Sequence, residues 1–177
     1  NNGASNYPLK GTKGDAWEGG FRVPMFWHWP AQIAAKTVID YPVSALALYP
    51  TFSKIANATL PKTKILDGID ILPVLKGEKR PSDDRMIYLF RHREGYNDVA
   101  ARKGDWKITR MGNEPWQMYN ITNDKGEKRN MSGANAPRLK KMMEETRLWT
   151  NSHIKPLWYF SQKDQELWEN EVLTGFN

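Results

Sequence analysis

Several short apolar runs lie close together between residues 86 and 120, and their spacing constrains the fold more than any other feature of the chain. Turn-forming pairs separate the runs, and one of them, Gly104-Asp105, is typical of a tight hairpin. Connections this short join antiparallel neighbours, because a parallel crossover needs a dozen or more residues. The pattern therefore predicts a small antiparallel sheet. Its predicted strands are Met86–Phe90, Val99–Arg102, Trp106–Thr109 and Trp116–Asn120.

A helix is predicted directly after this sheet, over residues 136–150. Asn135 is suited to cap it, and Pro137 fits its first turn, where a missing backbone N–H does no harm. Met142 and Trp149 recur on one face, whereas charged residues occupy the other. We expect the apolar face to cover one side of the sheet.

The first part of the chain has a different pattern, which is typical of an α/β domain. The run from Phe21 to Trp29 is apolar almost throughout, as in a strand that is buried on both faces of a sheet. Helical spacing follows at Leu48–Ala56, with Pro50 in the first turn, and a short helix is expected within Leu66–Gly77. One strand and two helices cannot form a covered parallel sheet, so this α/β piece is expected to be incomplete.

A polar linker, KGEKRPSDDR at residues 76–85, separates the two patterns. The sequence therefore predicts two domains. Residues 1–80 are expected to belong to the α/β domain, and residues 81–177 to a small α+β subdomain that contains the antiparallel sheet and the helix. The aromatic tail from Ile154 onward is assigned to no element.

Composition excludes several classes of protein. With 177 residues, of which 40% are hydrophobic, the chain can bury a core and is not a disordered chain. No apolar run approaches the roughly 18 residues of a membrane-spanning helix, and the polar start lacks the apolar region of a signal peptide. The chain has no cysteine, which excludes disulfides and a cysteine nucleophile within it.

The formal net charge of +6 is compatible with an anionic partner such as a sulfated polysaccharide, and equally with ordinary solubilising charge. Lysine and arginine are spread along the chain instead of forming one tract, which argues against nucleic acid.

The segment PLKGTKGDAWEGGFRVPMFWHWP, residues 8–30, resembles a conserved segment of the sulfatase family. Further matches follow in family order: LYPTF at 48–52, LDGIDILPVLKG at 66–77, ARKGDWKI at 101–108 and WQMYNITND at 116–124. Such matches in the right order make a specific signal. The chain is similar to the C-terminal part of an arylsulfatase-like member of the alkaline-phosphatase-like superfamily. The resemblance implies the C-terminal end of an α/β domain, followed by a subdomain with a small antiparallel sheet and one packed helix.

The resemblance places the sulfate-binding lysine of the family at Lys13 and not at Lys10. Gly11 and Gly14 flank it and permit close backbone approach. A lysine ammonium offers three donors to a sulfate oxygen, and a fixed cation stabilises the charge that develops in the transition state. Lys13 is therefore the predicted catalytic and substrate-binding residue. On spacing alone, a solvated loop lysine would be the commoner interpretation.

Arg91, His92 and Arg93 form a basic cluster after the first predicted strand of the sheet. Because the C-terminal subdomains of the family contribute to the rim of the substrate pocket, the resemblance makes all three candidates for substrate binding. An exposed basic turn explains the cluster equally well. Glu18 and Arg22 are predicted to pair across a bend as structural residues. No metal ligand is predicted within the chain.

The nucleophile motif of the family, Cys or Ser followed by x-Pro-x-Arg, is absent from this chain. In the family its first residue becomes formylglycine. The calcium ligands are also expected outside the chain, because Asn1 lacks the charge that a hard cation prefers. The resemblance thus implies a sulfuric ester hydrolase whose formylglycine and Ca²⁺ are supplied by an N-terminal portion, and this chain alone is predicted to be inactive. A periplasmic, secreted or lysosomal location is expected.

Two other functions stay open at this point. A sister enzyme of the superfamily would hydrolyse phosphate or phosphonate monoesters. A non-catalytic remnant would bind carbohydrate through aromatic side chains, with Trp158 and Tyr159 expected to be exposed. An incomplete α/β piece should expose a large apolar surface, which argues against an independent binding module.

Overall fold

The computed structural model describes residues 5–78, 84–93, 96–153, 157–159 and 161–171, without the side chains of residues 92, 93, 96 and 167–171. The chain forms two compact units. One contains the segment that ends at Val23 together with the chain from Tyr88 onward, and the other is Pro24–Ile87. The N-terminal segment therefore groups with the C-terminal sheet. The domain boundary near residue 80 stays a prediction about the whole protein.

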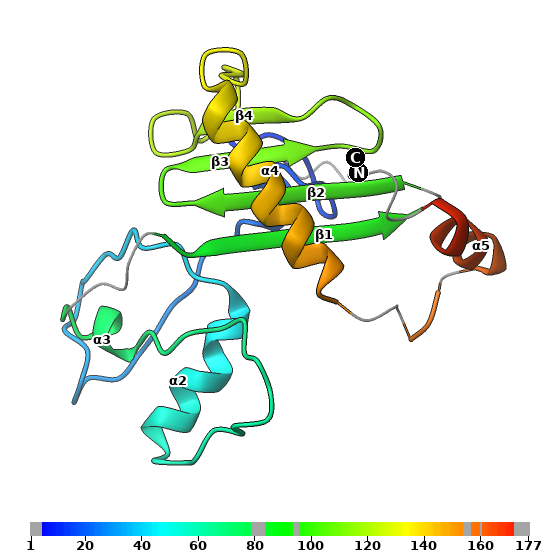
Figure 1. Cartoon of the computed structure of the whole chain (residues 1–177). Helices are drawn as coiled ribbons and strands as arrows, with labels where there is room; N and C mark the ends of the chain where they lie inside the picture. Colours follow the sequence, from blue (N-terminus) through cyan, green and yellow to red (C-terminus); the bar gives the residue numbers. More distant parts are fainter. Residues whose placement is uncertain (1–4, 79–83, 94–95, 154–156, 160, 172–177) are drawn as a thin grey trace. The chain divides into compact units, whose positions relative to one another are not determined.

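An antiparallel sheet forms the centre of the larger unit (Figure 1). Its strands, in the spatial order β1-β2-β3-β4, are β1 Met86–Arg93, β2 Tyr96–Lys103, β3 Trp106–Arg110 and β4 Gln117–Asn120. β2 and β3 pair antiparallel from Val99↔Arg110 to Lys103↔Trp106, and β3 and β4 pair antiparallel as well. Gly104, with φ 55°, lies in the two-residue connection between β2 and β3. The predicted small antiparallel sheet is confirmed.

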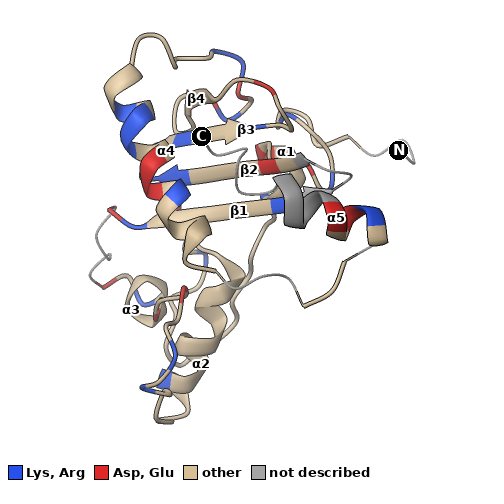
Figure 2. Cartoon of the chain, turned by 45° about the vertical axis from the view of Figure 1, so that its right-hand side comes forward, with Lys and Arg blue, Asp and Glu red and all other residues tan. Residues whose placement is uncertain are grey.

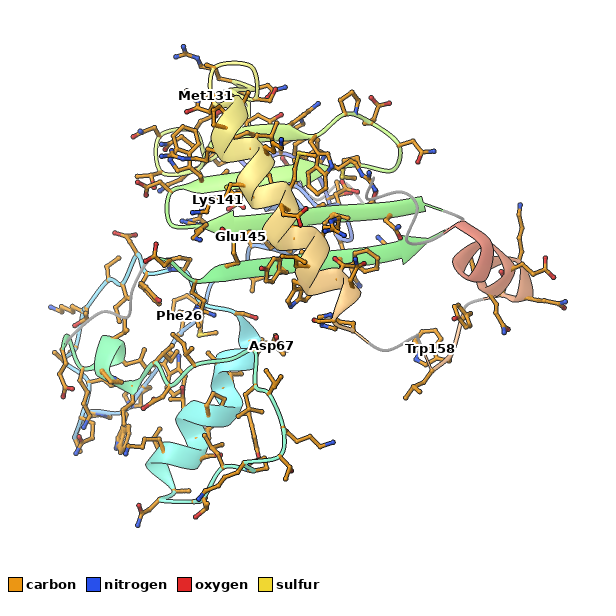
Figure 3. The ribbon with its side chains drawn as sticks, viewed as in Figure 1. Phe26, Asp67, Met131, Lys141, Glu145 and Trp158 are labelled. Atoms are coloured by element: carbon orange, nitrogen blue, oxygen red, sulfur yellow. The ribbon has the colours of Figure 1, made fainter. Side chains whose placement is uncertain are left out.

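The helix α4, Ala136–Asn151, covers one face of this sheet (Figure 1). Met142 is buried, and the Arg138 guanidinium lies 4.5 Å from the ring centroid of Trp106 in β3. Glu145, labelled on α4 in Figure 3, forms an ion pair with Lys103 of β2, with 3.0 Å between Oε2 and Nζ. The predicted helix and its place on the sheet agree with the structure.

The predicted side-chain cap of α4 is wrong. The Asn135 side chain makes no cap hydrogen bond, and its Nδ2 donates to the Met131 carbonyl at 3.3 Å. The Asn135 backbone, at φ −131° and ψ 36°, lies outside the extended conformation that a capping residue adopts. Pro137 occupies the first turn as predicted. Charged side chains of both signs follow along α4 (Figure 2).

The N-terminal segment covers the opposite face of the sheet and includes the short helix α1, Glu18–Phe21. The Thr109 hydroxyl of β3 donates to the Ala16 carbonyl at 3.4 Å, and Trp17 meets Tyr119 of β4 edge to face at 5.9 Å between ring centroids. Side chains alternate along a strand, so neighbouring residues of β3 face α4 and the N-terminal segment in turn. Both faces are covered, which is why Ile108 on one face and Lys107 and Thr109 on the other are all fully buried.

The smaller unit contains a 3-10 turn η1 (Ala45–Ala47) and the helices α2 (Leu48–Ile55) and α3 (Leu72–Leu75). Ala47, Ile71 and Leu75 form its buried cluster. The Thr51 hydroxyl donates to the Ala47 carbonyl at 2.7 Å and accepts from the Ile71 N–H at 3.0 Å. One hydroxyl therefore joins α2 to the segment before α3. Both helices agree with the predictions, including the place of Pro50 in the first turn.

The predicted strand from Phe21 to Trp29 is wrong as an element. Phe21 ends α1, and residues 22–29 belong to no strand or helix. The backbone at Arg22 is extended, at φ −76° and ψ 122°, but no described strand pairs with this segment. Phe26, labelled in Figure 3, is 89% exposed. A strand exists only through hydrogen bonds to a neighbour, so an apolar extended segment without that neighbour is not one.

The described part of the chain ends with the helix α5, Gln162–Glu171, in the tail for which the sequence predicted no element. Trp158, which precedes α5, is 68% exposed, as expected (Figure 3). Tyr159, also expected to be exposed, is half-buried. None of the described helices combines the length and the hydrophobicity needed to cross a bilayer.

Candidate functional site

Lys13 lies on a tight turn, which is held by a backbone hydrogen bond and by one carboxylate. The Thr12 N–H donates to Asp15 Oδ2 at 2.8 Å, and the Asp15 N–H donates back to the Thr12 carbonyl at 2.9 Å. Gly11 and Gly14 have φ of 85° and 95°, which glycine adopts without steric cost. The Lys13 side chain is exposed. The turn therefore projects a lysine from a defined backbone.

The two lysines of this segment have different surroundings. The Lys10 ammonium lies 3.5 Å from the ring centroid of Trp17, in a cation–π contact. The Lys13 ammonium makes no hydrogen bond or ion pair with any other residue that the structure describes. This difference is compatible with the prediction that Lys13, and not Lys10, binds sulfate. The role itself stays a prediction.

Arg91 of β1 meets the same turn from 77 residues away. Its Nη1 donates to the Gly14 carbonyl at 2.8 Å, and a Cβ added at Gly14 would lie 1.9 Å from that nitrogen. The structure thus brings two predicted site residues, Lys13 and Arg91, onto one turn. The other two, His92 and Arg93, lie in β1 by backbone, but their side chains are outside the described part.

The glycine pair after Glu18 lets α1 pack directly against this turn. The Gly19 N–H donates to the Lys10 carbonyl at 2.7 Å. A Cβ at Gly19 would lie 2.5 Å from the Gly11 carbonyl oxygen, and one at Gly20 would lie 2.0 Å from the Asp15 carbonyl oxygen. These are backbone atoms that cannot rotate away, so the turn and α1 move as one piece.

A buried ion network lies beneath α1, and we call Lys107, Glu127 and Glu18 the buried triad. Lys107 Nζ lies 2.7 Å from Glu127 Oε1 and 3.2 Å from Glu18 Oε1, and these side chains are at most 2% exposed. Glu127 Oε2 accepts the Glu18 N–H at 2.7 Å. Arg22 lies 3.4 Å from Glu18 Oε2, as the sequence predicted. The acidic α1 beside the sheet is visible in Figure 2.

Burial governs the ionisation of this region. It raises the pKa of the Glu127 carboxyl, although Lys107 and the Glu18 N–H lower it in part. Burial also raises the pKa of Tyr119. The negative charges of Glu127 and Asp124 add to this effect, and the pKa reaches about 12. Tyr119 therefore stays neutral over the physiological range and packs against Trp17 as an uncharged ring.

Sequence reasoning missed Lys107 and Glu127. Lys107 alternates with apolar neighbours in β3, a pattern typical of a strand with one solvated face. Its partner Glu18 is 89 residues away, and Glu127 is 109 residues from Glu18. No local signal reports pairs of this separation. The structure alone identifies the triad.

Calcium requires a set of oxygen ligands. Among the described residues, no group of three or more His, Cys, Asp or Glu side chains could hold a metal ion. Ca²⁺ and formylglycine stay predictions for a part of the protein beyond this chain.

The arrangement is suited to contact an anion at its edge. Lys13 offers an exposed ammonium on a fixed turn, and the Arg91 guanidinium lies against the same turn. A tetrahedral oxyanion with several acceptor oxygens matches such donors. The site therefore presents a positive edge, formed by Lys13 and Arg91.

Comparison with known proteins identifies the family. Residues 13–152 match the family described as N-sulphoglucosamine sulphohydrolase, C-terminal. The chain is 41% identical to Ps i-CgsB, solved in complex with k-i-k-neocarrahexaose, with a TM-score of 0.88 over 94% of this chain and 37% of that one. A sulfatase of Formosa agariphila is 36% identical over 146 residues, 74% of this chain.

Human steryl-sulfatase is 43% identical over 86 residues, 49% of this chain. The chain spans only 15% of the length of human steryl-sulfatase and 26% of the Formosa agariphila sulfatase. These relatives agree with the predicted fold class, the C-terminal part of an alkaline-phosphatase-like α/β fold. The chain therefore belongs to the sulfatases, as a C-terminal region of the N-sulphoglucosamine sulphohydrolase type.

Proposed function

We propose that this chain is the C-terminal part of an enzyme that hydrolyses sulfate esters of carbohydrates, with Lys13 as its cation at the sulfate group. The rest of the active site, including formylglycine and Ca²⁺, comes from an N-terminal portion of the same protein. Lys13 stabilises negative charge on the sulfate oxygens as the ester bond breaks. Arg91, with His92 and Arg93, contacts the substrate at the rim.

One observation carries this proposal: the exposed side chain of Lys13 stands on a turn whose backbone is held by hydrogen bonds to Asp15 and to α1. Electrostatic stabilisation depends on preorganisation, because a cation that is already in place costs no reorganisation during the reaction. A lysine on a loose loop would lack this property. The defined backbone of the turn supports this role for Lys13.

A sulfated carbohydrate is the proposed class of substrate. Ps i-CgsB, 41% identical to this chain, was solved with k-i-k-neocarrahexaose, an oligosaccharide. The net charge of +6 favours the approach of a polyanion. Sulfated polysaccharides combine both properties, and they place many sulfate groups within reach of one site.

Substitution of Lys13 tests the proposal. In the full-length protein, we expect Lys13→Ala to lower kcat for an aryl sulfate by roughly 100- to 1,000-fold, as loss of one transition-state donor does elsewhere. The matched control is Lys140→Ala, because Lys140 is an exposed lysine of α4, on the other face of the sheet. The control variant should keep the wild-type rate.

The same assay separates the competing functions. Hydrolysis of a sulfated oligosaccharide together with an aryl sulfate, and a much lower rate on the matched phosphate monoester, would support the proposal. A preference for phosphate or phosphonate monoesters would replace it with the sister activity. Binding of the oligosaccharide without any hydrolysis would instead identify a carbohydrate-binding remnant.

A further inference from the structure

We infer that the buried triad of Lys107, Glu127 and Glu18 is a positioning device, which holds the Lys13 turn where its ammonium meets the sulfate. This inference rests on the proposed function, because it assigns the triad an effect on that reaction through Lys13. Lys107 and Glu127 are positioning residues and do not touch substrate. Their effect should fall on the rate of the chemical step more than on binding.

The first link is between the sheet and α1. Lys107 projects from the middle of β3 and meets Glu18 and Glu127 at 3.2 Å and 2.7 Å. Glu127 also accepts the Glu18 N–H at 2.7 Å, so it contacts both the side chain of β3 and the backbone of α1. The Lys107 ammonium lies 4.4 Å from the ring centroid of Phe21, the last residue of α1. α1 is therefore held at both ends.

The second link is between α1 and the turn. Gly19 donates to the Lys10 carbonyl at 2.7 Å, and a Cβ at Gly20 would lie 2.8 Å from the Thr12 carbonyl oxygen. No flexible side chain lies between these backbones. A displacement of α1 is therefore transmitted to the residues on both sides of Lys13.

An ion network is suited to positioning in a way that apolar packing is not. Apolar contacts are non-directional, and they tolerate a small slip between surfaces. The triad joins its members through one short ion pair and two hydrogen bonds. A buried charge that loses its partner is strongly disfavoured. Ionic networks in a core are best attested where they specify one register. Here the register is the position of the Lys13 turn relative to the sheet.

The test replaces the ions without leaving a buried charge unpaired. Lys107→Met with Glu127→Gln removes one charge of each sign. The amide carbonyl introduced in place of the Glu127 carboxylate can still accept the Glu18 N–H, and Arg22 remains beside Glu18. In the full-length sulfatase we expect kcat for an aryl sulfate to fall by roughly 10- to 100-fold, as an ångström-scale misplacement does, while KM changes little.

A kinetic double-mutant cycle measures whether the effects of the triad and of Lys13 on kcat are coupled. A merely structural role of the triad would not produce such coupling. If the triad acts through Lys13, the paired substitution should cause no further loss of kcat in a Lys13→Ala background. The matched control is Lys103→Met with Glu145→Gln, which removes an ion pair of 3.0 Å on the α4 face. The control should keep kcat, and the thermal midpoint of each variant reports folding.

The possible results separate this inference from the proposed function. If Lys13→Ala is impaired but the paired triad variant folds and keeps full kcat, the inference fails and the proposed function stands. Equal losses in the wild-type and Lys13→Ala backgrounds would also overturn it. A full-length protein without sulfatase activity would overturn both. Should the paired variant not fold, Glu127→Gln alone, which keeps the acceptor for the Glu18 N–H, takes its place in the same cycle.

Discussion

At the scale of single residues, the site depends on glycines that stand where no side chain fits. Gly20 is the clearest case, because a Cβ there would lie 2.0 Å from the Asp15 carbonyl oxygen. Its neighbour across the contact is backbone, so the clash cannot be relieved by a rotamer change. The consequence is a local requirement for glycine within the WEGGFR segment.

Alanine substitution tests this requirement. We expect Gly20→Ala to lower the free energy of unfolding by about 1–3 kcal/mol, the usual cost of overpacking, and to lower kcat because the Lys13 turn must shift. Urea unfolding measures the first effect. The control is Gly133→Ala, because a Cβ at Gly133 meets nothing within 4 Å. Equal stability of the two variants would contradict the packing argument.

Tyr119 gives a prediction about pH. Its pKa is raised from 10.0 to about 12 in the folded protein, so folding disfavours the phenolate. The stability that this adds is fully present below pH 10 and is lost as the pH rises from about 10 through 12.

We expect Tyr119→Phe to flatten the loss of stability above pH 10. The tyrosinate absorbance of the wild type minus that of the variant should titrate near pH 12. A difference titration centred near pH 10 would show that Tyr119 is not shielded by burial and by its acidic neighbours.

At the scale of elements, the sequence predicts the strands and helices that are determined by neighbouring residues in the chain. Turn residues and short alternating runs predicted the strands of the sheet, and a strong amphipathic pattern predicted α4. The strand prediction for Phe21 to Trp29 was wrong because the apolar pattern indicates only that the segment is suited to be a strand. Whether it becomes a strand depends on a neighbour that the described chain does not contain.

The candidate site divides in the same way. Lys13 was predicted from the resemblance of its segment to the family, and the Glu18–Arg22 pair because its members are four residues apart. The Arg91 side chain contacts the turn from 77 residues away, and Glu18 of the buried triad is 89 residues from Lys107 and 109 from Glu127. Periodicity and turn chemistry carry no information about such pairs, so they had to come from the structure.

At the scale of the whole molecule, the chain spans only part of the length of each relative compared. It covers 37% of the Ps i-CgsB chain. The smaller unit leaves large apolar side chains in solvent, with Ile65 96%, Phe26 89% and Val38 84% exposed. Monomeric proteins rarely expose apolar area on this scale unless something else covers it.

This gives a prediction for the chain expressed by itself. We expect it to show no hydrolysis of an aryl sulfate, to self-associate and to bind a hydrophobic dye such as ANS. Phe26→Ser with Ile65→Ser should reduce dye binding, whereas the full-length protein should bind little dye. A chain that stays monomeric and gives no ANS fluorescence would contradict the inference that another part of the protein covers these side chains.

The larger unit is discontinuous, because its N-terminal segment rejoins the chain only from Tyr88 onward. On a ribosome, Glu18 emerges long before Glu127, its partner 109 residues later. At about 5–20 residues per second, this delay is roughly 5–20 seconds. During that time α1, which packs against the turn with Lys13, lacks its contact with Glu127. Within this chain, the turn with Lys13 is thus synthesised well before the contacts that order it, and any truncation before Glu127 leaves it without one of those contacts.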